Sequence, residues 1–308
     1  MMLVVSCTSG LCNRIHAILG SKILAYKLGR DFSVYWPRNG ELDLSFEVLF
    51  ESDIKLISQK DLLRRTAYPD CTLKVYNANT AGPREYENVG KDDTDETILI
   101  KPWTSPLMKG HVYDLDHNKA LSKTLQSLPF RERLVSKATP EKYRQHVGVH
   151  IRYGDYRKSG INHTERFGQS SVESFERSME LIRVAFPKVR FYVSCPNPDI
   201  KRRLGSKFNV EYRDIDPTRS PQGIKDAVVD LVNLSGCVFC LGSYQSQFSQ
   251  FLSLMSNKII GIVCDNPHVA YGNCGMSSSL EDFPKWVKKY LNASMAQQEV
   301  SFDAALDH

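Results

Sequence analysis

Val147-Gly148-Val149-His150-Ile151-Arg152-Tyr153-Gly154-Asp155 is an apolar stretch near the middle of the chain that leads into charged residues and a turn. The apolar and small residues at its start predict a buried β-strand, and His150 and Arg152, two residues apart, then point to the same side of it. Ligands of open α/β sheets bind at the carboxyl ends of the strands. We therefore expect this strand to carry both side chains to a ligand site, where Arg152 binds a phosphate and Asp155 fixes the turn. In the alternative, Arg152 forms a salt bridge with Asp155, because arginine is rarely buried without a partner.

Strand and helix signals alternate on both sides of this stretch. Upstream, a strand at Leu3–Ser6 leads into a helix at Ile15–Leu28 that stops at Gly29, and a second strand follows at Phe32–Trp36. Downstream, helices and strands alternate again between residues 172 and 263. The predicted fold class is therefore α/β, with two doubly wound domains of the Rossmann type that face each other across a cleft.

The length suits two domains of ordinary size or one large one, and the composition is that of a folded protein. The 308 residues, of which 42% are hydrophobic and 24% charged, are expected to form domains at 1–143 and 144–291, with a flexible tail at 292–308. The net charge of +5 is too small to indicate nucleic-acid binding and suits an anionic small molecule. The first residues lack a basic n-region and have the pattern of a strand, so we expect no signal peptide. No run of about 18 apolar residues occurs, and the eight cysteines are typical of buried thiols. We expect a soluble, cytoplasmic protein without a transmembrane segment or a nucleic-acid partner.

Two further segments have features of ligand-binding turns. In Gly10-Leu11-Cys12-Asn13-Arg14, a glycine allows close approach of the backbone, a helix N-terminus offers free N–H groups, and Arg14 adds a charge. The spacing is not that of a Walker loop or a dinucleotide fingerprint, and the alternative is a tight turn with Asn13 as the helix cap.

The second of these segments runs from Asp230 to Ser249, where a helix ends, a strand follows and a Gly242-Ser243 turn opens another helix. Hydroxyls and free backbone donors at that turn could hold a diphosphate. In the alternative, Ser243 and Ser246 only cap the helix.

No motif predicts a metal site. Cys237 and Cys240 form a C-x-x-C, but residues three apart on one strand face opposite sides, and no second pair follows at zinc spacing. Triplets of the Asp-x-Asp type, as in metal-dependent sugar transferases, begin at Asp93, Asp114 and Asp214, but short acidic triplets are common at turns.

Taken together, the three segments resemble the fucosyltransferase superfamily of GT-B glycosyltransferases, which includes the nodulation-type α1,6-fucosyltransferases and the protein O-fucosyltransferases. Residues 150–155 are similar to its H-x-R-R-x-D or H-x-R-x-G-D signature, residues 230–247 to its later D…S-S/T-x-F motif, and residues 10–14 to its glycine-rich opening loop. The order and approximate spacing also agree. Many members have a second arginine where this chain has Tyr153, so Arg14 or Arg157 would meet part of the phosphate charge.

The resemblance implies a GT-B-like fold with an acceptor-side first domain and a nucleotide-sugar-binding second domain. Arg152 would bind the β-phosphate of GDP-fucose and stabilise the leaving charge, and Asp230 would accept hydrogen bonds from guanine. Asn13 and Arg14 would reach toward the sugar and the acceptor. The remaining donor-side residues that the resemblance implies are His150, Asn197, Ser243, Ser246 and Gln247.

The resemblance further implies an inverting, metal-independent glycosyltransferase that moves fucose from GDP-fucose to a glycan hydroxyl and needs no cofactor. Direct displacement would need a base, for which Glu41, Asp43 and Glu165 are the candidates, whereas an ion-pair-like route would need none. The alternatives are a metal-dependent glycosyltransferase with another nucleotide sugar, and a non-catalytic module that binds a nucleotide sugar or a glycan.

Overall fold

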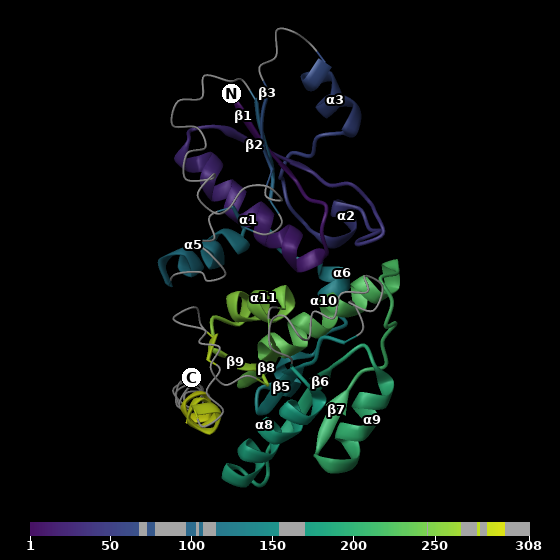
Figure 1. The fold of residues 1–308 in the computed structure, drawn as a ribbon, viewed down its shortest axis with the longest axis vertical. Helices are drawn as coiled ribbons and strands as arrows, with labels where there is room; N and C mark the ends of the chain where they lie inside the picture. Colours follow the sequence, from purple (N-terminus) through teal and green to yellow (C-terminus); the bar gives the residue numbers. More distant parts are fainter. Residues whose placement is uncertain are drawn as a thin grey trace, which may run out of the picture. The chain divides into compact units, whose positions relative to one another are not determined.

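The computed structural model describes residues 1–67, 73–77, 97–102, 105–106, 115–153, 170–244, 246–265, 276–277 and 282–292 (Figure 1). The chain forms two compact units: unit 1 comprises Met1–Leu134 and Arg219–Lys225, and unit 2 comprises Val135–Thr218 and Asp226–His308. Each unit contains a parallel sheet with helices, so the predicted α/β class is confirmed. Among the described helices, none combines the length and the apolar character that a bilayer-spanning segment needs.

Unit 1 is built on a four-stranded parallel sheet with the strand order β2-β1-β4-β3. All five residues of β1 are buried, as is typical of a central parallel strand covered on both faces. In chain order, its elements are β1 (Met2–Ser6), α1 (Leu11–Lys27), β2 (Asp31–Tyr35), α2 (Phe46–Leu49), α3 (Gln59–Ala67), β3 (Leu73–Asn77), β4 (Thr97–Lys101), α5 (Leu115–Leu125) and α6 (Glu132–Val135).

Helix α1 begins earlier than the sequence indicated and ends where it was expected to end. Its N-cap is Gly10, so Asn13 and Arg14 lie in its first turn and not in a loop before it. The alternative in which Asn13 caps the helix is therefore wrong. The helix stops before Gly29, whose φ of 61° is in the left-handed region that glycine adopts readily.

Unit 2 is built on a six-stranded sheet with the order β10-β9-β8-β5-β6-β7, in which every pairing is parallel. A final helix covers residues 283–292. In chain order, the other elements are η1, a short 3-10 helix (Pro140–Tyr143), β5 (His146–His150), α8 (Val172–Ala185), β6 (Arg190–Ser194), α9 (Pro198–Lys207), β7 (Val210–Tyr212), α10 (Pro221–Gly236), β8 (Phe239–Ser243), α11 (Gln247–Ser256), β9 (Ile260–Val263) and β10 (Met276–Ser277).

The strand order of this sheet reverses between β5 and β8. From β5 the chain adds β6 and then β7 on one side, and after α10 it returns to place β8 on the other side of β5. Crossover loops leave a crevice at such a switch point, on the carboxyl ends of the strands. The strand that carries His150 therefore ends where a ligand is expected in this fold class.

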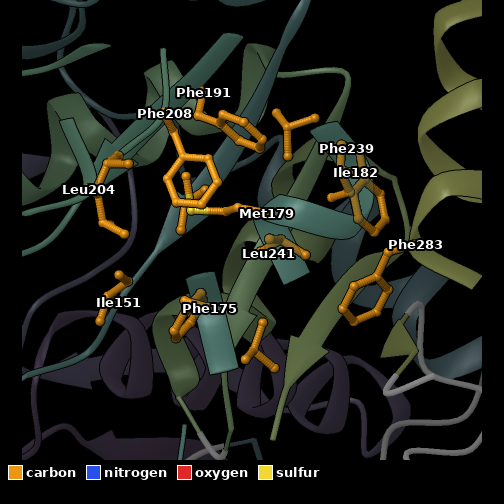
Figure 2. Close-up of a cluster of buried hydrophobic side chains, with 14 of the residues drawn as sticks. Ile151, Phe175, Met179, Ile182, Phe191, Leu204, Phe208, Phe239, Leu241 and Phe283 are labelled. Carbon is orange, nitrogen blue, oxygen red and sulfur yellow. The ribbon is translucent and has the colours of Figure 1, made fainter. Parts of the chain in front are cut away.

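The two faces of the sheet in unit 2 differ in character. One face packs on α8, α9 and helix 283–292 through a large apolar cluster, in which Phe175, Met179 and Ile182 of α8 lie against strand side chains (Figure 2). The opposite face is covered by α10 and α11 (Figure 1), and it carries small or polar residues such as Gly148 and His150. Polar groups therefore gather on the α10 and α11 side, because the other side is filled with hydrocarbon.

The N-terminal segment of unit 1 ends at Leu134, nine residues before the boundary expected from the sequence, and Arg219–Lys225 also belong to this unit. The segment that follows packs within unit 2. The backbone N–H of Thr139 donates to Asn233 Oδ1 at 2.7 Å, and the ring of Tyr143 lies 4.2 Å from that of Tyr192. The residues after 292, where the tail was expected, lie outside the described part of the chain.

Cys237 and Cys240 lie close together, which differs from the prediction. Helix α10 ends at Gly236 and β8 begins at Phe239, so Cys237 is not on the strand and the alternation of strand side chains does not apply to it. A Cβ placed on Gly148 would lie 2.6 Å from Cys240 Sγ and 3.2 Å from Cys237 Sγ, so both sulfurs face the same point of β5. Both thiols are buried and reduced.

Replacing Gly148 with alanine is expected to destabilise unit 2 by about 2 kcal/mol, because the new methyl group overpacks a filled core. It would meet Cys240 Sγ at 2.6 Å and Leu234 Cδ2 at 2.8 Å. The matched control is Gly205→Ala in α9, where the nearest atom is 3.9 Å away. That control should be neutral or stabilising, since alanine is the better helix former. Urea unfolding of the two variants measures the difference, and a Gly148→Ala protein as stable as the wild type would contradict this packing.

Candidate active site

The carboxyl ends of β5, β6 and β8 meet at one edge of the sheet in unit 2. In register, His150 lies between Ser194 of β6 and Gly242 of β8. Ser243 Oγ accepts a hydrogen bond of 2.9 Å from the backbone N–H of Arg152 and donates one of 3.3 Å to the carbonyl oxygen of His150. Ser243 thus holds the end of β5 against β8, at the point where Arg152 leaves the strand.

His150 is a buried, neutral histidine. Its ring stacks on Phe248 with the ring centroids 4.2 Å apart and an angle of 13° between the planes. Its Nδ1 lies 2.9 Å from Ser249 Oγ. Burial, and secondly the positive charge of Arg152, lowers the pKa of His150 to about 3. The imidazole is therefore uncharged near neutral pH.

Arg152 is the second residue after β5 and is half-buried, while Tyr153 is 39% exposed. The predicted position of Arg152 at the carboxyl end of a buried strand is therefore observed. Asp155, its partner in the alternative interpretation, lies outside the described residues.

Asp230 lies on α10 with only 2% of its surface exposed. Its Oδ1 accepts hydrogen bonds from the hydroxyl of Tyr192 at 2.7 Å and from Arg213 at 3.0 Å. Its Oδ2 accepts one of 2.7 Å from Ser194 Oγ. Burial raises the pKa of Asp230, and the three donors act against that rise. A carboxylate has about four acceptor positions, so these partners leave about one for any other donor.

Arg213 connects this carboxylate to a second one. Its guanidinium also contacts Asp226, with Nη2 at 3.3 Å from Asp226 Oδ1, and Asp226 Oδ2 accepts from the backbone N–H of Asp216 at 3.2 Å. Asn233 Nδ2 donates to the hydroxyl of Tyr192 at 3.1 Å, which extends the network along α10. The network fixes β6 and the residue that follows β7 against α10.

Three further candidates lie at the N-termini of helices. Ser246 is the N-cap of α11, and its hydroxyl accepts from the backbone N–H of Ser249. The capping alternative therefore holds for Ser246, whereas Ser243 is the last residue of β8. Gln247 is the first residue of α11. Asn197 is the N-cap of α9 and accepts from the N–H groups of Asp199 and Ile200.

In unit 1, the guanidinium of Arg14 is bound by other residues of the same unit, which differs from its predicted role toward the sugar and the acceptor. It is 1% exposed and lies 4.7 Å from the ring centroid of Trp36. Its guanidinium donates to the carbonyl oxygens of Ser9 and Pro37 and, at 2.9 Å, to Asn39 Oδ1. Burial lowers the pKa of Arg14 to about 10, so the side chain stays charged at neutral pH.

Asn13 differs from its neighbour because its side-chain oxygen is unused. Oδ1 of Asn13 is buried and has no hydrogen-bond partner within the described part of the chain. Buried polar atoms are rarely left in this state, and the exceptions are often functional. Gly10, just before the helix, has a φ of −68°, which any residue adopts.

The remaining candidates are ion-paired or lie outside the described ranges. Glu41 pairs with Arg219, and Asp43 pairs with Arg38 at 2.8 Å. Asp216 accepts from the backbone and the hydroxyl of Thr218, which is a turn interaction. Arg157, Glu165 and the triplet that begins at Asp93 are not among the described residues. Within residues 1–67, 73–77, 97–102 and the later described ranges, no group of three metal-ligating side chains occurs.

The sequence did not indicate roles for the residues that contact His150 and Asp230. Ser194 could have been found, because it ends the strand next to His150 and a serine at a strand end faces the same crevice. Nothing in the spacing indicates the others, since each contacts a residue that is distant from it in the sequence; they are Tyr192, Arg213, Phe248 and Ser249.

Comparison with known proteins gives matches among solved structures. No protein-family model matches the chain, and no curated protein sequence matches it. Fucosyltransferase NodZ from Bradyrhizobium matches with a TM-score of 0.60 and 13% identity, over 87% of this chain and 96% of that one. The chain shares the fold of this fucosyltransferase. NodZ alpha-1,6-fucosyltransferase co-crystallized with GDP gives a TM-score of 0.58 at 13% identity, over 82% and 92% of the two chains. A mutant of Arabidopsis thaliana FUT1 in complex with GDP gives 0.57 at 11% identity, over 85% and 69%. At these identities the likeness establishes the fold, and the predicted GT-B-like class is confirmed.

Proposed function

We propose that the protein is an inverting, metal-independent glycosyltransferase that transfers fucose from GDP-fucose to a hydroxyl group of a glycan. The observation that carries this proposal is the set of groups at the switch point of unit 2: Arg152 at the end of β5, neutral His150 beside it, and the N-terminus of α11. The fold of the fucosyltransferases, two of them described with GDP, supports it. We assign the donor to unit 2 and the acceptor to unit 1.

Arg152 has the properties that departure of a diphosphate requires. In the reaction, the acceptor oxygen forms a bond to C1 of fucose, and the bond between C1 and the β-phosphate oxygen breaks. The electron pair of that bond stays on the phosphate, so negative charge grows there. A fixed arginine stabilises this charge without a metal ion, and its planar fork suits two phosphate oxygens. The hydrogen bond that the backbone N–H of Arg152 donates to Ser243 Oγ holds this residue in place.

The N-terminus of α11 and neighbouring side chains would bind the nucleotide. Backbone N–H groups at a helix N-terminus favour phosphate oxygens, and Gln247 and Ser246 are the first residues there. His150 is uncharged and adds a hydrogen bond without adding charge. Asn197, as the cap of α9, would lie by the base or ribose and keep that helix start in position.

Asp230 would act mainly by holding its neighbours. Its three protein donors leave about one acceptor position for a guanine N–H group. We therefore assign to Asp230 at most one contact with the base. Its main role would be to hold Ser194 in position at the end of β6.

In unit 1, Asn13 is half-buried in the first turn of α1 and would contact the substrate, and Arg14 would act through the loops that it holds. The acceptor hydroxyl loses its proton either to a carboxylate or to the departing phosphate. Glu41, Asp43 and Glu165 remain the candidates for a base.

Binding and turnover of GDP-fucose test this function. GDP should raise the thermal unfolding temperature, since a ligand at 100 times its Kd stabilises by about 2.7 kcal/mol, while UDP and ADP should have little effect. GDP-fucose supplied with a glycan panel should release GDP, and EDTA should leave the rate unchanged. Stabilisation by UDP in place of GDP would overturn the assigned donor. Loss of turnover in EDTA would favour a metal-dependent transferase, and GDP binding without any turnover would favour a non-catalytic module.

A further inference from the structure

The imidazole of His150 is held by a residue from a distant part of the sequence. Ser249, in the first turn of α11, brings its Oγ to 2.9 Å from Nδ1 of His150 at the end of β5. Ser249 is fully buried, and His150 is 7% exposed. Which of the two groups donates determines where the proton of the neutral ring resides.

The surroundings of Ser249 decide the direction of this bond. Within the described part of the chain, the Ser249 hydroxyl makes one hydrogen bond, the one to His150. The contact with Ser246 involves the backbone N–H of Ser249 and not its hydroxyl. If Nδ1–H donated to the hydroxyl, the hydroxyl hydrogen would be buried without an acceptor, which is unfavourable. If the hydroxyl donates to Nδ1, both groups are satisfied. The ring proton of neutral His150 then lies on Nε2.

Packing keeps the two residues in this arrangement. A Cβ placed on Gly242 would lie 2.5 Å from Ser249 Oγ, so the hydroxyl fills the space that a glycine leaves on β8. Phe248 stacks on the ring of His150 and prevents it from turning over. No hydrogen bond to Nε2 occurs among the described residues. Burial keeps the ring neutral by lowering its pKa to about 3.

We propose that Ser249 is a positioning residue that holds His150 in the Nε2–H tautomer, so that Nε2–H donates to an oxygen acceptor of the nucleotide. This role rests on the proposed function, because it assigns the nucleotide to the edge of the sheet where His150 lies. An oxygen of a phosphate or of the ribose fits such a donor, whereas the lone pair of the other tautomer would repel it. Because His150 is neutral, Arg152 is the member of this pair that carries a positive charge at the site.

The tautomer is measured without any nucleotide. In protein labelled with [15N]histidine, a long-range proton–nitrogen correlation spectrum at neutral pH should show His150 with a protonated Nε2 and an unprotonated Nδ1. His150→Gln assigns the signals by removing them. Ser249→Ala should shift the ring toward the Nδ1–H form. A wild-type ring protonated on Nδ1, or a Ser249→Ala spectrum identical to that of the wild type, would overturn the proposal.

Affinity for GDP, measured by calorimetry, tests the consequence for binding. Ser249→Ala should weaken GDP binding about tenfold, the effect of one hydrogen bond to a charged or polar ligand. Ser249→Cys keeps a side chain of similar size and a weak donor, so its affinity for GDP should lie between those of the wild type and Ser249→Ala. The matched control is Ser253→Ala in the same helix, whose hydroxyl donates to the carbonyl oxygen of Lys258 at 2.8 Å and which should bind GDP as the wild type does.

The two measurements separate this inference from the proposed function. If the wild type does not bind GDP, the proposed function fails, and the spectrum still decides the tautomer. If GDP binds and Ser249→Ala binds it as tightly as Ser253→Ala does, the positioning role is overturned while the nucleotide assignment stands.

Discussion

The Arg152→Ala variant is expected to transfer fucose about 1000-fold more slowly than the wild type while keeping its fold. Removing one group that stabilises a developing oxyanion costs about 100- to 1000-fold in kcat, and here the lost group also carries a full charge. The side chain is half-buried at the end of β5, so its loss creates no large cavity. The measurement is the rate of GDP release from saturating GDP-fucose, with circular dichroism to verify the fold.

Two further variants make this result specific. Arg152→Lys keeps the charge but not the planar fork, and it should retain only part of the lost rate. Arg190→Ala is the matched control, because Arg190 begins β6 at the opposite edge of the sheet and pairs with Glu211 at 3.6 Å. That control should turn over as the wild type does. An Arg152→Ala rate within tenfold of the wild type would remove Arg152 from the mechanism.

The position of Arg152 could be predicted because it depends on local pattern and on a general rule. Apolar residues before His150 indicate a buried strand, and alternation of strands and helices indicates a parallel sheet. In such a sheet the ends of the strands form the ligand site, so two residues at one strand end could be assigned without any contact information. The structure contains this strand at His146–His150, next to the switch point.

The interpretation of Arg14 differed from the structure because its partners are distant in the sequence. Near Gly10, the arginine has the spacing of a ligand-binding turn. The ring of Trp36 and the side chain of Asn39 come from the segment after β2, and they bind the guanidinium inside unit 1. Spacing within one turn contains no information about such partners. The same reason applies to Asp230, whose donors belong to β6 and to the residue after β7.

The Arg213→Ala variant is expected to lower the stability of unit 2 by about 3 kcal/mol, the low end of the cost of breaking a buried ion pair. Asp230 is 2% exposed and would keep its charge without the cation that lies 3.0 Å away. Asp226 would lose its contact as well. The shift in the urea unfolding midpoint measures this loss. The matched control is Arg202→Ala on α9, whose ion pair with Asp199 is exposed and should contribute nothing measurable.

The dependence of this loss on pH identifies its cause. Burial raises the pKa of Asp230 above its unfolded value, and Arg213 opposes that rise, so the variant should have a still higher pKa in the folded state. A raised carboxyl pKa stabilises the fold below the unfolded pKa of about 3.9, and this contribution is lost as the pH rises through the folded pKa. The deficit of Arg213→Ala should therefore be greatest at neutral pH and shrink toward pH 4. Adding Asp230→Asn to the variant should restore part of the stability at neutral pH, because no buried charge then remains unpaired. A deficit that is the same at both pH values, with no recovery in the double variant, would mean that Arg213 stabilises the unit by packing and not by its charge.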